Sequence, residues 1–110
     1  MTENDRDDRS WFAIFRAAVD AAYDAVLITD AELDRPGPRI IHANPAFSRM
    51  TGYGLDEILG ESPRILQGPE TDPAVMQRLR DDLEHGRHFE GSTKNYRKDG
   101  TVFEMEWTIA

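Results

Sequence analysis

The sequence predicts an α+β fold in which an antiparallel sheet carries short helices over one face. Three observations indicate this fold class. Residues 101–110 alternate between apolar and polar side chains, as a half-buried strand does. Asn-Pro at 44–45 and Asp-Pro at 72–73 are typical helix starts. A length of 110 residues, 39% of them apolar, suits one domain with one core.

Composition and charge exclude several function classes. The net charge of −8 argues against binding to nucleic-acid phosphates, and the absence of cysteine removes thiolate metal sites and cysteine nucleophiles. A chain without cysteine also fits a cytoplasmic location. No apolar run is long enough to span a bilayer. We find no catalytic constellation, phosphate loop or metal-ligand spacing, so the chain is not predicted to be an enzyme.

Residues 1–23 are interpreted as a polar segment followed by an amphipathic helix. Ser10 is expected to cap this helix, which should end near Tyr23. Large apolar side chains recur along one stripe of it at helical spacing. The stripe either packs on its own domain or pairs two copies of the chain. The residues predicted to form a homodimer interface are Trp11, Phe12, Phe15 and Val19.

Residues 24–110 hold the remaining elements. Two strand candidates, 25–29 and 39–43, flank a loop with two prolines. Short helices are predicted over 44–52 and 54–59, and a longer one over 72–86. The clearest hairpin joins 88–97 to 101–110 through a turn at Lys98-Asp99-Gly100. One face of its second strand is apolar and consists of Phe103, Met105, Trp107 and Ile109.

The stretch Gly60–Gly68 lies between the two sets of helices. Pro63 and the flanking glycines argue against a long helix there. Ile65 and Leu66 are apolar, whereas Arg64 and Gln67 need polar partners. This mixture is typical of a segment that forms the wall of a small cavity.

Five short motifs resemble those of the PAS sensor family, in the same order and over nearly the whole chain. The motifs are Ile28-Thr29-Asp30, His42-Ala43-Asn44-Pro45-Ala46-Phe47, Met50-Thr51-Gly52-Tyr53, Leu66-Gln67-Gly68-Pro69-Glu70-Thr71-Asp72 and Asn95-Tyr96-Arg97-Lys98-Asp99-Gly100. The resemblance implies a five-stranded antiparallel sheet covered by short helices. It also implies a domain that passes a signal to an attached output domain.

Within that family the chain resembles the LOV subset, which binds flavin and senses blue light. LOV domains read Asn-Cys-Arg-Phe-Leu-Gln where this chain reads Ser-Pro-Arg-Ile-Leu-Gln over 62–67. Pro63 replaces the cysteine that attacks the flavin, so adduct photochemistry is excluded. The resemblance implies that Arg64 and Arg80 match the phosphate-binding arginines. It also implies that Gln67 lies near the ribityl chain and Asn95 at the polar edge of the ring. A second ring-reading asparagine is replaced by Met105.

The candidate cavity lining therefore consists of Arg64, Gln67, Arg80, Asn95 and Met105. We predict that no cofactor is bound, because the Met105 side chain cannot read a polar ring edge and should fill space instead. The two arginines would then pair with acids such as Glu61, Asp81 or Glu84. Non-covalent FMN or FAD is the alternative.

Haem is not predicted, since it needs an axial histidine from the long helix. His85 ends that helix and is interpreted as a capping charge. His42 lies on a strand candidate, and His88 lies at the start of another.

The resemblance places the family's fifth strand between the first and the fourth, and residue 110 is the end of the fourth. We expect a PAS domain truncated within a longer protein; a strand donated by a partner and a rearranged hairpin are the alternatives. The predicted function is a regulatory module of a bacterial-type signalling protein. It would sense a small ligand, or relay signals through dimer packing, to a histidine kinase or a diguanylate cyclase or phosphodiesterase. The alternative function is a non-covalent flavin sensor of redox state or light.

Overall fold

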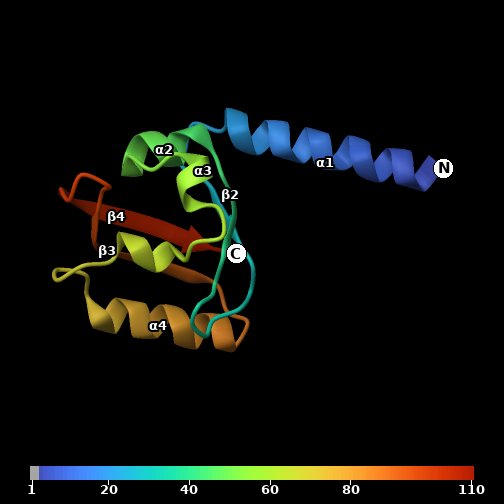
Figure 1. Cartoon of the computed structure of the whole chain (residues 1–110). Helices are drawn as coiled ribbons and strands as arrows, with labels where there is room; N and C mark the ends of the chain where they lie inside the picture. The colour runs from blue at the N-terminus through green and yellow to red at the C-terminus, as the bar shows by residue number, and fades with distance from the viewer. Residues whose placement is uncertain (1–2) are drawn as a thin grey trace.

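The computed structural model describes residues 3–110, and side chains from Ser10 onward. A long N-terminal helix extends away from a body of two hairpins and several short helices (Figure 1). The molecule measures 51 × 32 × 24 Å, and α1 accounts for its elongated shape. The elements in chain order are α1 (Glu3–Ala21), β1 (Leu27–Thr29), β2 (Ile40–Ala43), α2 (Pro45–Thr51), α3 (Leu55–Ile58), a 3₁₀ helix (Pro63–Leu66), α4 (Pro73–Glu84), β3 (Phe89–Tyr96) and β4 (Val102–Ile109).

The helix α1 differs from its predicted bounds at both ends. It begins at Glu3, seven residues before the expected cap Ser10, and ends at Ala21 rather than at Tyr23. Residues 3–9 contain no proline or glycine, so nothing in the backbone chemistry stops the helix before Ser10. The expectation of a cap at Ser10 was therefore wrong.

The predicted helix starts are confirmed at both proline pairs. Asn44 caps α2 through a hydrogen bond from the backbone N–H of Phe47, and Gly52 ends α2 with a φ of 81°. Asp72 caps α4 by accepting from the N–H of Ala74. Between α3 and α4, Pro63 opens a single 3₁₀ turn instead of a long helix, as the sequence predicted.

The hairpin of β3 and β4 is confirmed with a regular register. Phe89 lies opposite Ile109, and Tyr96 lies opposite Val102. Gly100 in the connecting turn has a φ of 88°, which favours glycine. On β4 the predicted apolar face turns inward, while the alternate residues are exposed.

The strands form two separate two-stranded sheets. Over residues 3–110, β1 pairs only with β2 and β3 pairs only with β4, both antiparallel. The family's fifth strand would lie between β1 and β4, and the sequence predicted that this chain lacks it; no strand occupies that place in the described residues. Met105 of β4 packs against the core cluster, which includes Ile40 and Ala43 of β2.

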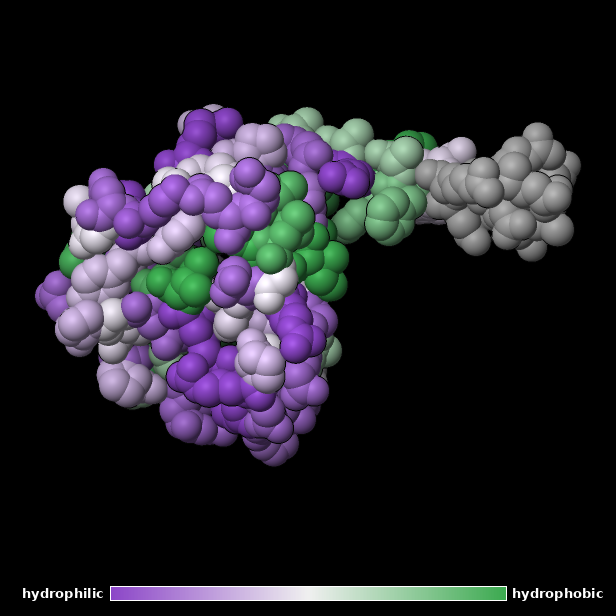
Figure 2. Space-filling model, in the orientation of Figure 1, coloured by the Kyte–Doolittle hydropathy of each residue, from purple (hydrophilic) through white to green (hydrophobic). Residues whose placement is uncertain are grey.

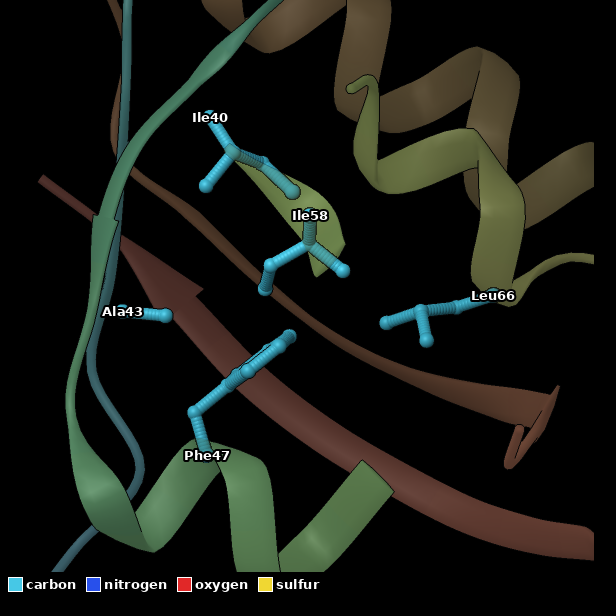
Figure 3. Close-up of a cluster of buried hydrophobic side chains, with 5 residues drawn as sticks. All are labelled: Ile40, Ala43, Phe47, Ile58 and Leu66. Carbon is cyan, nitrogen blue, oxygen red and sulfur yellow. The ribbon is translucent and has the colours of Figure 1, made fainter. Parts of the chain in front are cut away.

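The core lies between the hairpins and the short helices. Figure 3 shows side chains of β2, α2, α3 and the 3₁₀ helix pointing into one space. The buried members are Ile40, Ala43, Phe47, Ile58 and Leu66, and Met105 of β4 packs against them. Leu66 is 2% exposed, so the central stretch contributes to the core as its apolar residues predicted.

Candidate functional site

The two arginines predicted from the sequence lie close together. The guanidinium of Arg64 donates to the carbonyl oxygen of Leu33 at 2.7 Å and also to that of Gly37. Arg80 donates to the same oxygen of Leu33 at 3.2 Å. The 3₁₀ helix supplies one arginine and α4 the other, and the loop before β2 lies between them. The structure therefore gathers guanidinium donors at one end of the predicted lining.

The surroundings shift the pKa values of the two arginines in opposite directions. Burial lowers the pKa of Arg64, and the nearby guanidiniums of Arg35 and Arg80 lower it further. By contrast, the hydrogen bonds that Arg80 donates to the carboxylates of Asp34 and Glu84 raise the pKa of Arg80. The Nη2 of Arg80 lies 2.5 Å from Asp34, and its Nε lies 2.8 Å from Glu84. Of the acids named from the sequence, Glu84 is thus a partner of Arg80, and Asp34 was missed.

The other end of the lining is organised around the amide of Asn95, which is 4% exposed. The hydroxyl of Thr71 donates its one proton to the carbonyl oxygen of Lys94 at 2.8 Å, so toward Asn95 it can only accept. The Asn95 nitrogen therefore points to Thr71 at 3.3 Å, and also to the carbonyl oxygens of Lys94 and Leu66 at 3.1 and 3.3 Å. Asn95 is satisfied by groups of its own chain.

Met105 and Gln67 complete the predicted set. Met105 lies opposite Thr93 on the hairpin, and its side chain packs against the core cluster. Gln67 ends the 3₁₀ helix, where its backbone N–H donates to the carbonyl oxygen of Arg64 at 3.0 Å, and it is half-buried. Met105 thus lies against the core, whereas Arg64 and Arg80 lie in the cationic cluster.

These residues fit only part of a flavin. The guanidiniums of Arg64 and Arg80 have the chemistry to bind a phosphate, since each can offer paired N–H donors. The ring end does not fit, because the Asn95 amide is engaged with Leu66, Lys94 and Thr71 and the Met105 thioether is only a weak acceptor. With no cysteine in the sequence, no cysteinyl adduct can form.

The predicted dimer stripe is exposed on the projecting part of α1. Trp11 is 69% exposed and Phe12 is 70% exposed, followed by Ile14 at 64% and Phe15 at 51%. Val19, by contrast, is half-buried, near the end of the helix that meets the body. Figure 2 shows apolar surface on the part of α1 next to the body and mainly hydrophilic surface around α4. Ile14 belongs to this surface and was missed from the sequence.

Two polar residues, His42 and Asn44, make tertiary contacts near the end of α1 that were not predicted from the sequence. Asn44 was predicted only as a helix cap, yet its amide also contacts Val19 and Asp24. His42 lies 2.6 Å from Asp20 of α1. The sequence carries no local signal for either contact, because they join residues at least twenty positions apart.

The described part of the chain contains no group of three or more histidines and carboxylates placed to hold a metal. None of its helices is long and apolar enough to cross a membrane. One open surface depression is lined by Glu70, Asp72, Ser92, Thr93, Lys94 and Glu104, and it includes none of the five predicted lining residues.

Comparison with known proteins identifies the family. The model of the PAS domain family matches residues 24–110. Phototropin-2 of Oryza sativa subsp. japonica is 43% identical over 86 residues, which are 78% of this chain and 9% of that protein. A blue-light-activated histidine kinase of Brucella canis is 39% identical over 89 residues, which are 81% of this chain and 18% of that protein. The chain thus spans less than a fifth of the length of these curated relatives.

A solved structure supports the same assignment. The structure described as "Flavin Analogue Sheds Light on Light-Oxygen-Voltage Domain Mechanism" superposes with a TM-score of 0.69 at 37% identity. The match covers 84% of this chain and 66% of that chain. The chain therefore belongs to the PAS domain family, and it is similar to the light-oxygen-voltage (LOV) domains within that family.

Proposed function

We propose that this chain is a regulatory PAS module that relays signals through the pairing of α1 with its copy in a homodimer. The observation that carries this proposal is the position of α1, which meets the body near α2 and exposes Trp11, Phe12, Ile14 and Phe15 beyond it. Monomeric proteins rarely leave such a contiguous apolar surface in water. A second copy of α1 would cover it.

The exposed area supplies a large part of what a specific dimer needs. Three of these residues are aromatic, and an aromatic side chain can bury 150–250 Å², so together with Ile14 they offer about 500 Å² per copy at their observed exposure. Complete burial of two copies would cover about 1,000 Å², the area that a specific interface has to exceed, so neighbouring residues of α1 would contribute the rest.

The domain itself is proposed to catalyse no reaction. A rearrangement of the core, caused by a small ligand or a partner, would shift the equilibrium between two packings of α1. The attached output domain, a histidine kinase or a diguanylate cyclase or phosphodiesterase, would read that shift. A blue-light-activated histidine kinase among the relatives supports the first of these outputs.

Two matched substitutions test the dimer. Phe15 and Leu59 are both 51% exposed, but Phe15 lies on α1 and Leu59 lies at the end of α3. Sedimentation equilibrium should show a dimer for the wild type and for Leu59→Glu, and a monomer for Phe15→Glu. A dimer that survives in Phe15→Glu, with unchanged affinity, contradicts the proposal.

A second candidate function is a non-covalent flavin sensor of redox state or light. The observation that favours it is the convergence of Arg64 and Arg80 on one carbonyl oxygen, where a flavin phosphate could take its place. The absorption spectrum of the purified protein, before and after denaturation, separates the two candidates. Flavin bands that are lost in Arg80→Ala would support the second one, and a colourless wild type would exclude it.

A further inference from the structure

The side chain of Asn44 joins three separate segments of the chain. Its oxygen accepts from the N–H groups of Val26 and Phe47, at 2.8 and 3.0 Å. Its nitrogen donates to the carbonyl oxygens of Val19 and Asp24, both at 2.9 Å. The amide uses both donors and accepts two hydrogen bonds, and Asn44 is 0% exposed.

The bond to Val19 attaches α1 to the body. Val19 lies in the last turn of α1, and its carbonyl oxygen accepts from the backbone N–H of Ala22 at 3.2 Å. The same oxygen also accepts from the buried side chain of Asn44, which caps α2. The direction in which α1 leaves the body therefore depends on a residue fixed in the core.

A second contact lies one residue further along α1. The Nε2 of His42 lies 2.6 Å from the carboxylate of Asp20, and the His42 side chain is only 13% exposed. His42 lies in β2 and Asn44 directly follows the strand with an extended backbone (φ −85°, ψ 168°), so the two side chains lie on one face. Ala43 between them is a member of the core cluster. The end of β2 thus contacts α1 on one side and the core on the other.

We propose that His42 and Asn44 form a two-point joint that sets the direction of α1 and couples it to the core. Asn44 is a positioning residue, because it acts on the dimer surface through α1 and not by contact. Phe47, whose N–H bonds to Asn44, is itself part of the core cluster, so a shift of the core moves the anchor of α1. This inference deepens the proposed function and rests on it for its biological meaning.

Asn44→Asp separates the joint from the helix cap. Aspartate can still accept from Val26 and Phe47, so α2 keeps its cap. The group that replaces the amide nitrogen is an oxygen, which as a carboxylate donates to neither carbonyl oxygen, and as a protonated acid donates to only one of those of Val19 and Asp24. The matched control is Asp72→Asn, the reverse exchange at the cap of α4, where no contact to α1 is present in the described residues.

The readout is the distance between α1 and the body within one chain. Because the sequence has no cysteine, spin labels can be attached at Ala13→Cys on α1 and Gln77→Cys on α4, both exposed positions. Labelled protein is diluted with unlabelled protein, so that only distances within a chain are measured. Thermal unfolding of each variant, followed by circular dichroism, reports separately on overall stability.

Asn44→Asp should widen the distance distribution about twofold, as α1 moves relative to the body, whereas Asp72→Asn should leave it narrow. An unchanged distribution in folded Asn44→Asp overturns the proposal. If that variant does not fold, Asp20→Ala removes the second contact from the α1 side, and an unchanged distribution there overturns the two-point joint. If the wild type is monomeric in sedimentation, the dimer proposal is refuted but the joint is not. The distances within one chain would still test the joint.

Discussion

Arg64 and Arg80 donate to the same carbonyl oxygen, that of Leu33, at 2.7 and 3.2 Å. This shared acceptor holds the loop before β2 against the 3₁₀ helix and α4. The two arginines differ in their surroundings, because Arg64 also donates to Gly37, which is buried, whereas Arg80 pairs with Asp34 and Glu84 at the surface. Their contributions to stability should therefore differ.

Arg64→Ala should destabilise the fold more than Arg80→Ala. Loss of Arg64 leaves the buried Gly37 carbonyl without its charged donor and leaves the Leu33 carbonyl with Arg80 alone, at a cost of about 1–2 kcal/mol. Loss of Arg80 removes ion pairs that water replaces easily, so its effect should be smaller. Urea unfolding of the two variants checks this order. Equal losses of unfolding free energy in the two variants would show that the loop before β2 is held by other contacts.

Thr71→Val should destabilise the protein by about 1–3 kcal/mol, because it leaves buried polar groups unpaired. The hydroxyl of Thr71 accepts from the N–H of Gly68 and donates to the carbonyl oxygen of Lys94. Thr71→Ser keeps the hydroxyl and is the matched control. In urea unfolding, the free energy of unfolding should be clearly higher for the serine variant than for the valine variant. Equal values would contradict the role given to the hydroxyl.

Gly68→Ala should destabilise through a clash with one aromatic ring. A Cβ at this position would lie 2.3 Å from a ring carbon of Tyr96. Overpacking of this kind costs about 1–3 kcal/mol. In a Tyr96→Ala background the ring is absent, so the same change should cost little. A double-mutant cycle measures this coupling, and additive effects of the two changes would refute it.

Glu57 and Lys98 should give a pH-dependent contribution to stability. A hydrogen bond from Lys98 lowers the pKa of Glu57 below its ordinary 4.5, and the same contact raises the pKa of Lys98 above 10.5. The Glu57 contribution is therefore present above pH 4.5 and is lost as the pH falls through the lowered pKa. The Lys98 contribution is present below pH 10.5 and is lost as the pH rises through the raised pKa.

Glu57→Gln should flatten the acid side of the stability curve. The variant lacks the carboxylate, so its melting temperature should fall less than that of the wild type between neutral pH and the acid limit. Both side chains are exposed, and the difference should shrink in high salt. Parallel acid limbs for wild type and variant would show that the pair contributes nothing.

The sequence predicted most of the fold because its signals are local. Asn-Pro and Asp-Pro fix the starts of α2 and α4, and the alternation over 102–109 fixes β4 and its inner face. The start of α1 was misplaced because a polar run without proline or glycine does not mark a helix boundary.

The site could be predicted only in part, because its remaining contacts are tertiary. Arg64 and Arg80 were identified through a family resemblance, but the carbonyl of Leu33 that unites them is a loop atom with no side-chain signature. The link from Asn44 to Val19 joins residues 25 positions apart and depends on how α1 leaves the body. Local patterns do not encode either arrangement.

The most direct test of the account is the distance between the α1 helices of two copies. A single spin label at Arg16→Cys, which is exposed, reports on this distance, and a label at Gln77→Cys on α4 is the control. Since paired helices lie about 8–10 Å apart, the account predicts a distance within about 30 Å between labels at position 16. Position 77 should give a longer distance or none. A dimer in which position 16 gives no such distance would contradict the claim that α1 pairs with its copy.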